Sequence, residues 1–190
     1  MLFTGIQYKN RRRILEQLSD KVMRFHVLAN SDSVGDQALK LEVRDAVGSL
    51  LREKMQAADS REACIRMIEE ELPEIRRTAE EVVESYGYDY PVEAGIQNVD
   101  FPVKSYGDYT FPAGNYEALE LVIGEGAGRN WWCVMYPNMC FSGTVYEVVD
   151  AAADASLQEV LSEEEYKTVI DTGNYKVQFK YLKFLNRLCE

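Results

Sequence analysis

The hydrophobic period of this chain changes three times, and these changes restrict the folds it can adopt. The stretch "KVMRFHVLAN", which begins at Lys21, alternates in a period of two, as a half-buried strand does. Apolar residues then recur at helical spacing from Leu39 to Val83. Residues 88–141 are rich in Tyr, Phe, Pro, Gly, Val and Ile, which is typical of strands and rigid turns, and a helical period returns after residue 156. This order predicts an α+β fold, with a small, mainly antiparallel sheet packed with several α-helices.

The predicted helices have defined ends. Pro73 should interrupt the second helical stretch, as a kink or as the first turn of a new helix, and Gly87 should close it. Three helix starts are predicted. They lie at Asp32 or Ser33, at a capping box of Asp59 with Glu62, and at a capping box of Ser162 with Glu165.

Three strands are predicted in the aromatic-rich region, around Val92–Ile96, around Leu119–Ile123 and at "NWWCVMY". The glycines of "GEGAG" should form a hairpin connection between the last two strands, at positions that need positive φ. A phosphate site is disfavoured there, because a strand follows the glycines instead of a helix and Glu125 would repel the anion.

Size and charge limit the classes of function. With 190 residues, 46% of them hydrophobic, we expect one domain over residues 21–190, preceded by a stem over residues 1–20 that is helical or partly flexible. The formal net charge of -11 argues against nucleic acid as a partner. No apolar run is long enough to span a membrane, and "MLFTGIQYKN" lacks the core of an export signal. We expect no cofactor.

The stretch Ile123–Phe141 holds both tryptophans and two of the four cysteines. Alternation places Trp131 and Trp132 on opposite faces, so that one can join the core and the other can contact a partner. Across a turn at Tyr136-Pro137, Cys133 and Cys140 either form a disulfide or remain two small buried thiols. A zinc site is disfavoured, because no C-x-x-C spacing exists and the chain has one histidine.

Two patterns raise the question of an enzyme. Asp171-Thr172-Gly173 resembles an aspartic peptidase motif, but such enzymes need two aspartates on β-rich halves, so a helix end capped by Gly173 is the better interpretation. His26 could act as a general base oriented by Glu125 or Asp32, in a hydrolase site for peptidoglycan or a peptide that also draws on Asn30 and Arg129. The alternative for His26 is an ordinary surface or packed strand residue, and a plain wall-binding module using Trp and Tyr is a further alternative.

Two blocks carry a family resemblance. "RFHVLANSDSVGDQALKLEVRDAV" (Arg24–Val47) and "FPVKSYGDYTFPAGNYEALELVIGEGAGRNWWCVMYPNMCF" (Phe101–Phe141) resemble the stage II sporulation protein R family. The resemblance implies a signalling protein made in the forespore and exported into the space between the forespore and mother-cell membranes. There it would activate a membrane-embedded aspartic protease of the mother cell, which processes pro-sigma-E. Members normally carry an export signal, which this sequence lacks.

On this basis the protein is expected to be a ligand and not a protease. An interface depends on a few large anchors, and the candidates are Trp132, Tyr136, Phe111 and Arg129. In an oxidising space, a Cys133–Cys140 disulfide would brace the hairpin that presents them.

Overall fold

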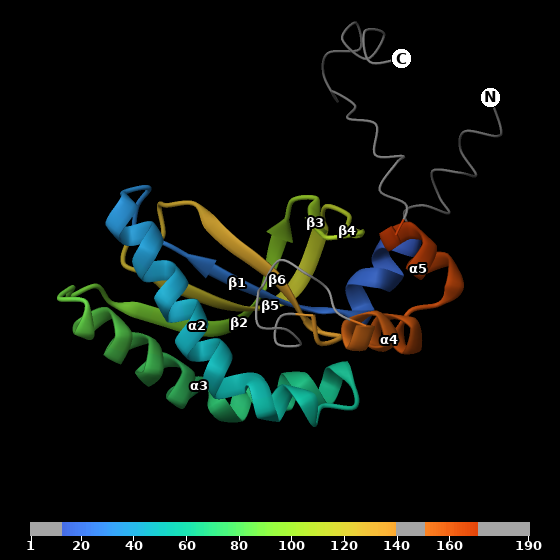
Figure 1. Ribbon diagram of the computed structural model, residues 1–190, viewed down its shortest axis with the longest axis horizontal. Coiled ribbons are helices and arrows are strands. Elements are labelled where there is room, and N and C mark those ends of the chain that lie inside the picture. Colours follow the sequence, from blue (N-terminus) through green and yellow to red (C-terminus); the bar gives the residue numbers. More distant parts are fainter. Residues whose placement is uncertain (1–12, 140–150, 171–190) are drawn as a thin grey trace, which may run out of the picture.

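A computed structural model describes residues 13–139 and 151–170 of the chain. Its main sheet has four strands in the order β2-β5-β1-β6, formed by β2 (Val92–Phe101), β5 (Gly114–Ile123), β1 (Met23–Leu28) and β6 (Asn130–Tyr136). Strand β1 is parallel to β5, whereas the pairs β1–β6 and β2–β5 are antiparallel. The predicted α+β fold with a small, mainly antiparallel sheet is confirmed (Figure 1).

The expected hairpin between β5 and β6 is wrong, because β1 lies between these two strands. The loop over residues 124–129 therefore crosses the end of β1 instead of joining neighbouring strands. Its glycines do take the expected backbone conformation, with φ of +60° at Gly124 and +61° at Gly126.

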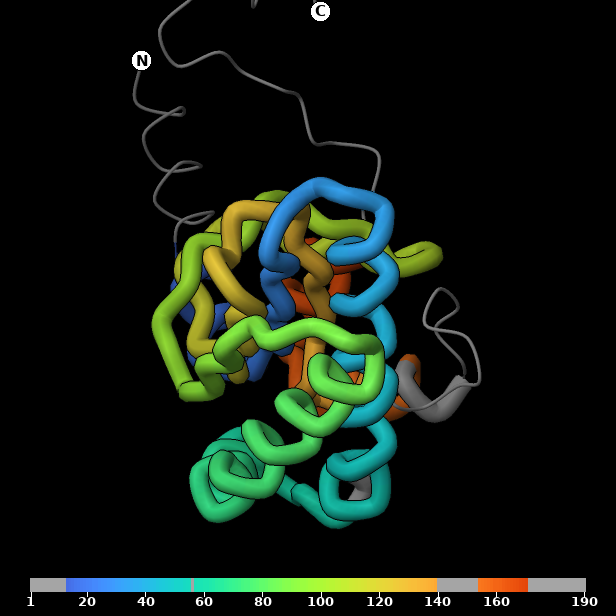
Figure 2. The backbone as a smooth tube through the Cα atoms, turned by 90° about the vertical axis from the view of Figure 1, so that its left-hand side faces the viewer, coloured from blue at the N-terminus to red at the C-terminus, as the bar shows by residue number. Residues whose placement is uncertain are grey.

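Helices α2 (Val34–Gln56) and α3 (Arg61–Ser85) cover one face of the sheet, as Figures 1 and 2 show. Ser33 caps α2 as predicted, because its side chain accepts a hydrogen bond from Asp36 N. The predicted capping box of Asp59 is wrong by one residue, since Ser60 is the cap of α3. Pro73 lies inside this continuous helix, and Gly87 follows its end with φ of +80°. The buried residues of this core include Phe25, Val27, Leu39, Val43, Val47, Ile68, Ile75, Val83, Leu119 and Leu121.

Described elements cover the opposite face of the sheet at one of its ends. Residues 13–21 are helical there, beside α4 (Ala151–Val160) and α5 (Glu163–Ile170), and the hairpin of β3 (Lys104–Tyr106) and β4 (Tyr109–Phe111) lies nearby (Figure 1). These elements enclose a second apolar cluster that includes Leu18, Val22, Phe101, Phe111, Tyr116, Val134, Leu157 and Val169.

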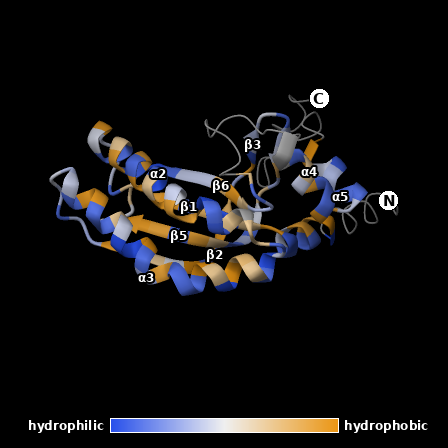
Figure 3. Cartoon of the chain, turned by 60° about the horizontal axis from the view of Figure 1, so that its bottom comes forward, coloured by the Kyte–Doolittle hydropathy of each residue, from blue (hydrophilic) through white to orange (hydrophobic). Residues whose placement is uncertain are grey.

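This second cluster corrects the expectation that β1 is half-buried. Arg24 and His26, on the polar side of the alternation, are 0% and 2% exposed, because the second layer covers them. Figure 3 shows the hydrophobic strand β5 near the centre of the molecule. The predicted capping box of α5 is present, with Ser162 N donating to Glu165 Oε2 at 2.7 Å and Glu165 N to Ser162 Oγ at 3.4 Å.

The pattern Asp171-Thr172-Gly173 lies outside the described residues. Within the described ranges, no helix combines the length and apolar character needed to cross a bilayer.

Candidate partner-binding surface

Two loops interlock beyond the carboxyl ends of the parallel strands β1 and β5. We call this feature the loop clasp, and it consists of residues 29–33 and 124–129. Gly128 N donates to Ala29 O at 2.9 Å, and Ala127 N donates to Asn30 O at 3.1 Å. The side chain of Asn30 adds a further link, because its Oδ1 accepts a hydrogen bond from Glu125 N at 3.0 Å. The end of an open sheet at parallel strands is a common place for a functional site.

Glycines make the clasp possible. A Cβ atom on Gly128 would lie 2.2 Å from Ser31 O, a backbone atom that cannot move aside easily. A Cβ atom on Gly124 would lie 2.3 Å from Asn30 Oδ1, and the residue also has positive φ. The glycine-rich sequence "GEGAG" therefore allows the two loops to approach each other closely.

Asp36 anchors the other side of the clasp. Its carboxylate accepts hydrogen bonds from Ser31 Oγ and, at 3.0 Å, from Asn30 Nδ2. These bonds, first of all the one from Ser31, hold the pKa of the buried Asp36 carboxyl below its ordinary value. An ionised carboxylate near the start of α2 also complements the helix dipole.

Arg129 is fixed through its backbone while its side chain extends into solvent. Its backbone N donates to Asp32 Oδ1 at 2.7 Å, and its carbonyl oxygen accepts from Lys40 Nζ at 2.9 Å. The side chain is 80% exposed, with Nε 3.7 Å from Asp32 Oδ2. The clasp thus presents a guanidinium group from a rigid backbone, which suits a contact residue.

The residues considered for a hydrolase do not form one site. The structure brings Asn30, Asp32, Glu125 and Arg129 into the clasp, but His26 lies in the middle of β1. Asn30, which holds Glu125, is four residues farther along the chain, and four extended residues span roughly 13 Å. The pairing of His26 with Glu125 is therefore wrong. The carboxylate beside His26 is that of Glu120, with Oε1 3.3 Å from Nδ1 in a direction that does not make a hydrogen bond.

His26 is also poorly suited to general base catalysis. Its ring stacks on Trp132 with centroids 3.8 Å apart and an interplanar angle of 9°. Burial first, and then the charge of Arg24, lower the pKa of His26 from 6.5 to about 4. The ring is therefore neutral and enclosed at neutral pH, as a packed strand histidine is.

The three aromatic contact candidates differ in their access to solvent. Phe111 is completely buried, so it is not available to a partner and this candidate is corrected. Trp132 is half-buried against His26 and Phe101, and Tyr136 is half-buried with its hydroxyl donating to Asp59 O at 3.2 Å. Trp131 is half-buried too and packs against the core under α2 and α3, whereas Trp132 packs against the second cluster, so the two tryptophans lie on opposite faces as expected.

Sequence reasoning missed Arg24, a fully buried cation. Its guanidinium lies 4.3 Å from the centroid of Phe101 and also faces Tyr106, Phe111 and Tyr116. Nε donates to the carbonyl of Cys133 at 2.8 Å and Nη2 to Tyr106 Oη at 2.9 Å, while Nη1 has no hydrogen-bond partner among the described residues. Burial lowers the pKa of Arg24. The only signal in the sequence was an arginine on an alternating strand, together with the many aromatics of residues 101–116.

Comparison with known proteins identifies a family that matches this chain. A family model described as Stage II sporulation protein R matches residues 19–147, which is more than half of the chain. The chain belongs to the stage II sporulation protein R family. Stage II sporulation protein R of Bacillus subtilis (strain 168) is 40% identical over 124 residues, which are 65% of this chain and 55% of that relative. The match thus spans about half the length of the relative. No solved structure matches the chain significantly. Family membership gives the protein a role in sporulation.

The two cysteines that the structure describes in this stage II sporulation protein R family member differ in state. Cys133 is disulfide-bonded, but its predicted partner Cys140 lies outside the described residues, so that pairing stays a prediction. Cys64 is a free thiol in the core, 3.6 Å from the sulfur of Met23, and burial raises its pKa to about 12. Cys64 is therefore an inert core residue at neutral pH.

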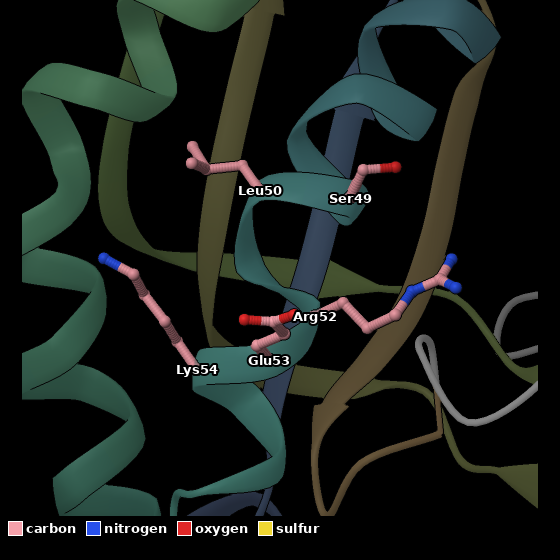
Figure 4. A pocket seen from close by; sticks show the side chains of 5 residues that line it. All are labelled: Ser49, Leu50, Arg52, Glu53 and Lys54. Atoms are coloured by element: carbon pink, nitrogen blue, oxygen red, sulfur yellow. The ribbon is translucent and has the colours of Figure 1, made fainter.

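No other part of the chain that the structure describes offers a better candidate for a functional site. Ser49, Leu50, Arg52, Glu53 and Lys54 line a hollow of about 290 Å³, but Figure 4 shows these neighbouring α2 side chains pointing in different directions. Among the described residues, no group of three or more His, Cys, Asp or Glu side chains is arranged to hold a metal ion. The loop clasp, with Arg129 exposed on it, is the best candidate for contact with a partner.

Proposed function

We propose that this protein is an extracytoplasmic signal of endospore formation. In this proposal it leaves the forespore and activates a membrane-embedded aspartic protease of the mother cell, and the protease then processes pro-sigma-E. The observation that carries the proposal is membership of the stage II sporulation protein R family, with 40% identity to the Bacillus subtilis protein of that name.

The loop clasp supports a ligand rather than an enzyme. Its polar groups are used to hold the two loops together, through Asp36, Asn30 and Asp32, so they are not arranged around a substrate. The clasp leaves the guanidinium of Arg129 exposed to solvent, beside Asp32. A rigid surface with an exposed anchor lowers the entropy lost on docking to a partner. The hydrolase alternative at His26 and Glu125 has no geometric support.

The test is cleavage of pro-sigma-E in membranes that contain the protease. Three reactions are compared: the membranes with this protein, the membranes alone, and this protein with pro-sigma-E alone. Cleavage only in the first reaction is the expected result. Cleavage by the protein alone would overturn the ligand proposal, and so would an absence of cleavage in membranes that a known activator renders active.

Arg129→Ala should reduce activation in the same assay without lowering stability, because the side chain is 80% exposed. Arg66→Ala is the matched control, since Arg66 is an exposed arginine on α3. Equal activity of both variants would remove Arg129 from the contact surface.

A further inference from the structure

Exposed large hydrophobic residues gather around the first two turns of α2. Among the described residues, five such side chains are exposed, and three of them, Val34, Leu41 and Tyr86, lie on α2 or directly after α3. Val34 is 89% exposed and Leu41 is 39% exposed. These two residues are seven positions apart, with the exposed Ala38 between them, so all three project from one face of the helix. This face is apolar although it is open to solvent.

The apolar face of α2 points away from the core. The residues of α2 that enter the core, such as Leu39 and Val43, lie on the opposite side of the helix, and α2 itself lies at the surface of the molecule (Figure 1). Tyr86 extends the apolar face on the side of α3. Its hydroxyl forms a hydrogen bond with Glu42, which is the first cause of its raised pKa. We call this surface the outer stripe, and it consists of Val34, Ala38, Leu41 and Tyr86.

Positive charge borders the outer stripe on the side of the loop clasp. Lys40 Nζ donates to the carbonyl of Arg129 at 2.9 Å, and Arg44 follows one turn later on α2. Lys40 is 5% exposed, and within the described ranges it forms no salt bridge, since its other hydrogen bond goes to Gln37 Oε1 at 2.7 Å. Burial first, and then the charge of Arg44, lower the pKa of Lys40. Three cations thus lie close together in a chain whose formal net charge is -11.

The guanidinium of Arg129 keeps its capacity for hydrogen bonds. Its side chain donates none to the described part of the chain, and Asp32 Oδ2 is 3.7 Å from its Nε, which is beyond hydrogen-bond distance. A guanidinium has five N–H donors, and it binds a carboxylate through two parallel hydrogen bonds. A carboxylate placed on Arg129 would gain these donors and would offset the repulsion among Lys40, Arg44 and Arg129.

We propose that the outer stripe and Arg129 together bind an amphipathic helical segment of the partner polypeptide. Apolar side chains of that segment cover Val34, Ala38 and Leu41, and a carboxylate of the segment pairs with Arg129. The proposal rests on the proposed function, because the partner is taken to be the activated protease. Val34 and Leu41 are two turns apart, roughly 10 Å, which matches the spacing of apolar anchors on a partner helix.

Charge complementarity selects a polypeptide over a lipid surface. An anionic membrane would repel a chain with a net charge of -11, because its field acts on the whole molecule. A single carboxylate at Arg129 meets only the local group of cations. The outer stripe would then supply most of the contact area, and Arg129 would set the orientation of the bound segment.

The test of the outer stripe measures co-sedimentation with protease-containing membranes and cleavage of pro-sigma-E in the same membranes. Val34→Glu combined with Leu41→Glu should weaken both by roughly tenfold or more, because charge replaces the apolar contact. The matched control is Val103→Glu combined with Ile170→Glu, at the two other exposed large hydrophobic residues, which are 46% and 39% exposed. Circular dichroism monitors folding, and Val34→Glu alone, at the more exposed position, replaces the double variant if that variant does not fold.

The test of the carboxylate uses the charge of Arg129. Arg129→Glu should weaken binding by roughly tenfold or more, whereas Arg66→Glu, at an exposed position of α3, should not. Binding of the wild type should also weaken as the salt concentration rises, and Arg129→Ala should reduce this dependence. Tighter binding by Arg129→Glu would indicate a basic partner segment and would overturn the proposal.

The outcomes separate this proposal from the proposed function. Loss of binding in the stripe and Arg129 variants, with normal controls, supports the proposal. An active wild type with equally active variants overturns the binding surface alone, whereas an inactive wild type overturns the proposed function and the surface with it. Equal sedimentation with membranes that lack the protease would assign the surface to lipid, and self-association that disappears in Val34→Glu would assign it to a second copy of the chain. Either of these results also overturns the proposal.

Discussion

His26 gives a prediction whose size follows from the structure. The residue is 2% exposed, and its pKa falls from 6.5 to about 4 on folding. Between these values the unfolded chain binds a proton that the folded chain does not bind. Stability must therefore decrease as the pH falls through this window and is regained as the pH rises.

The magnitude is set by the depressed pKa of His26. Each pKa unit corresponds to about 1.4 kcal/mol, so a difference of about 2.5 units makes the full loss about 3.5 kcal/mol, reached below pH 4. At pH 5 the loss relative to pH 7 is about 2 kcal/mol. Carboxylates also titrate in acid, so the wild type is compared with His26→Phe, which keeps an aromatic ring against Trp132 and cannot titrate.

The assay is urea unfolding of both proteins at pH 7 and pH 5. The wild type should lose about 2 kcal/mol more than His26→Phe over this interval, which corresponds to a midpoint shift of about 1 M urea. Because the chain has one histidine, nuclear magnetic resonance can follow its ring protons without ambiguity. The same pH dependence in both proteins, or a histidine that titrates near 6.5 in the folded state, would refute the reasoning.

Three further predictions concern stability at other positions, each measured by urea unfolding. Gly128→Ala should cost about 1–3 kcal/mol, because its Cβ atom would overlap Ser31 O, whereas Gly95→Ala should be nearly neutral, and equal effects would contradict the close approach. Asp36→Ala should cost about 1–3 kcal/mol at pH 7. This cost should shrink as the pH falls through the depressed pKa of Asp36, and a constant cost would show that the charge is irrelevant. Arg24→Ala should cost about 3 kcal/mol or more, while Arg24→Met, which keeps most of the volume and removes a desolvated charge, should cost less than about 1.5 kcal/mol. If Met is as harmful as Ala, the charge of Arg24 and its hydrogen bonds hold the second cluster together.

Local features were predictable from the sequence because they depend on neighbours in the chain. The cap at Ser33 and the box of Ser162 with Glu165 follow from side chains that reach amide groups three residues away. The strand at "NWWCVMY" followed from its own composition and became β6. Such contacts do not require knowledge of the rest of the fold.

Long-range neighbours were not predictable in the same way. The glycine-rich segment after β5 signals a change of direction, but it cannot show that β1 lies between β5 and β6. The partner of His26 was misassigned for this reason, because strand register places Glu120 beside it instead of Glu125. Alternation likewise predicted that β1 is half-buried, and only the hairpin of β3 and β4 and its neighbours reveal that a second layer covers Arg24.

The position of β1 also determines the order in which the strands of the sheet can pair during folding. The central strand is the first strand to be synthesised, yet both of its neighbours, β5 and β6, come from residues 114–136. A chain that emerges with its N-terminus first, from a ribosome or a translocation channel, can pair α2 with α3 early but must hold β1 unpaired until β5 appears. The two edges of β1 therefore stay without their strand partners until residues 114–136 have been added, which favours a late, cooperative closure of the sheet.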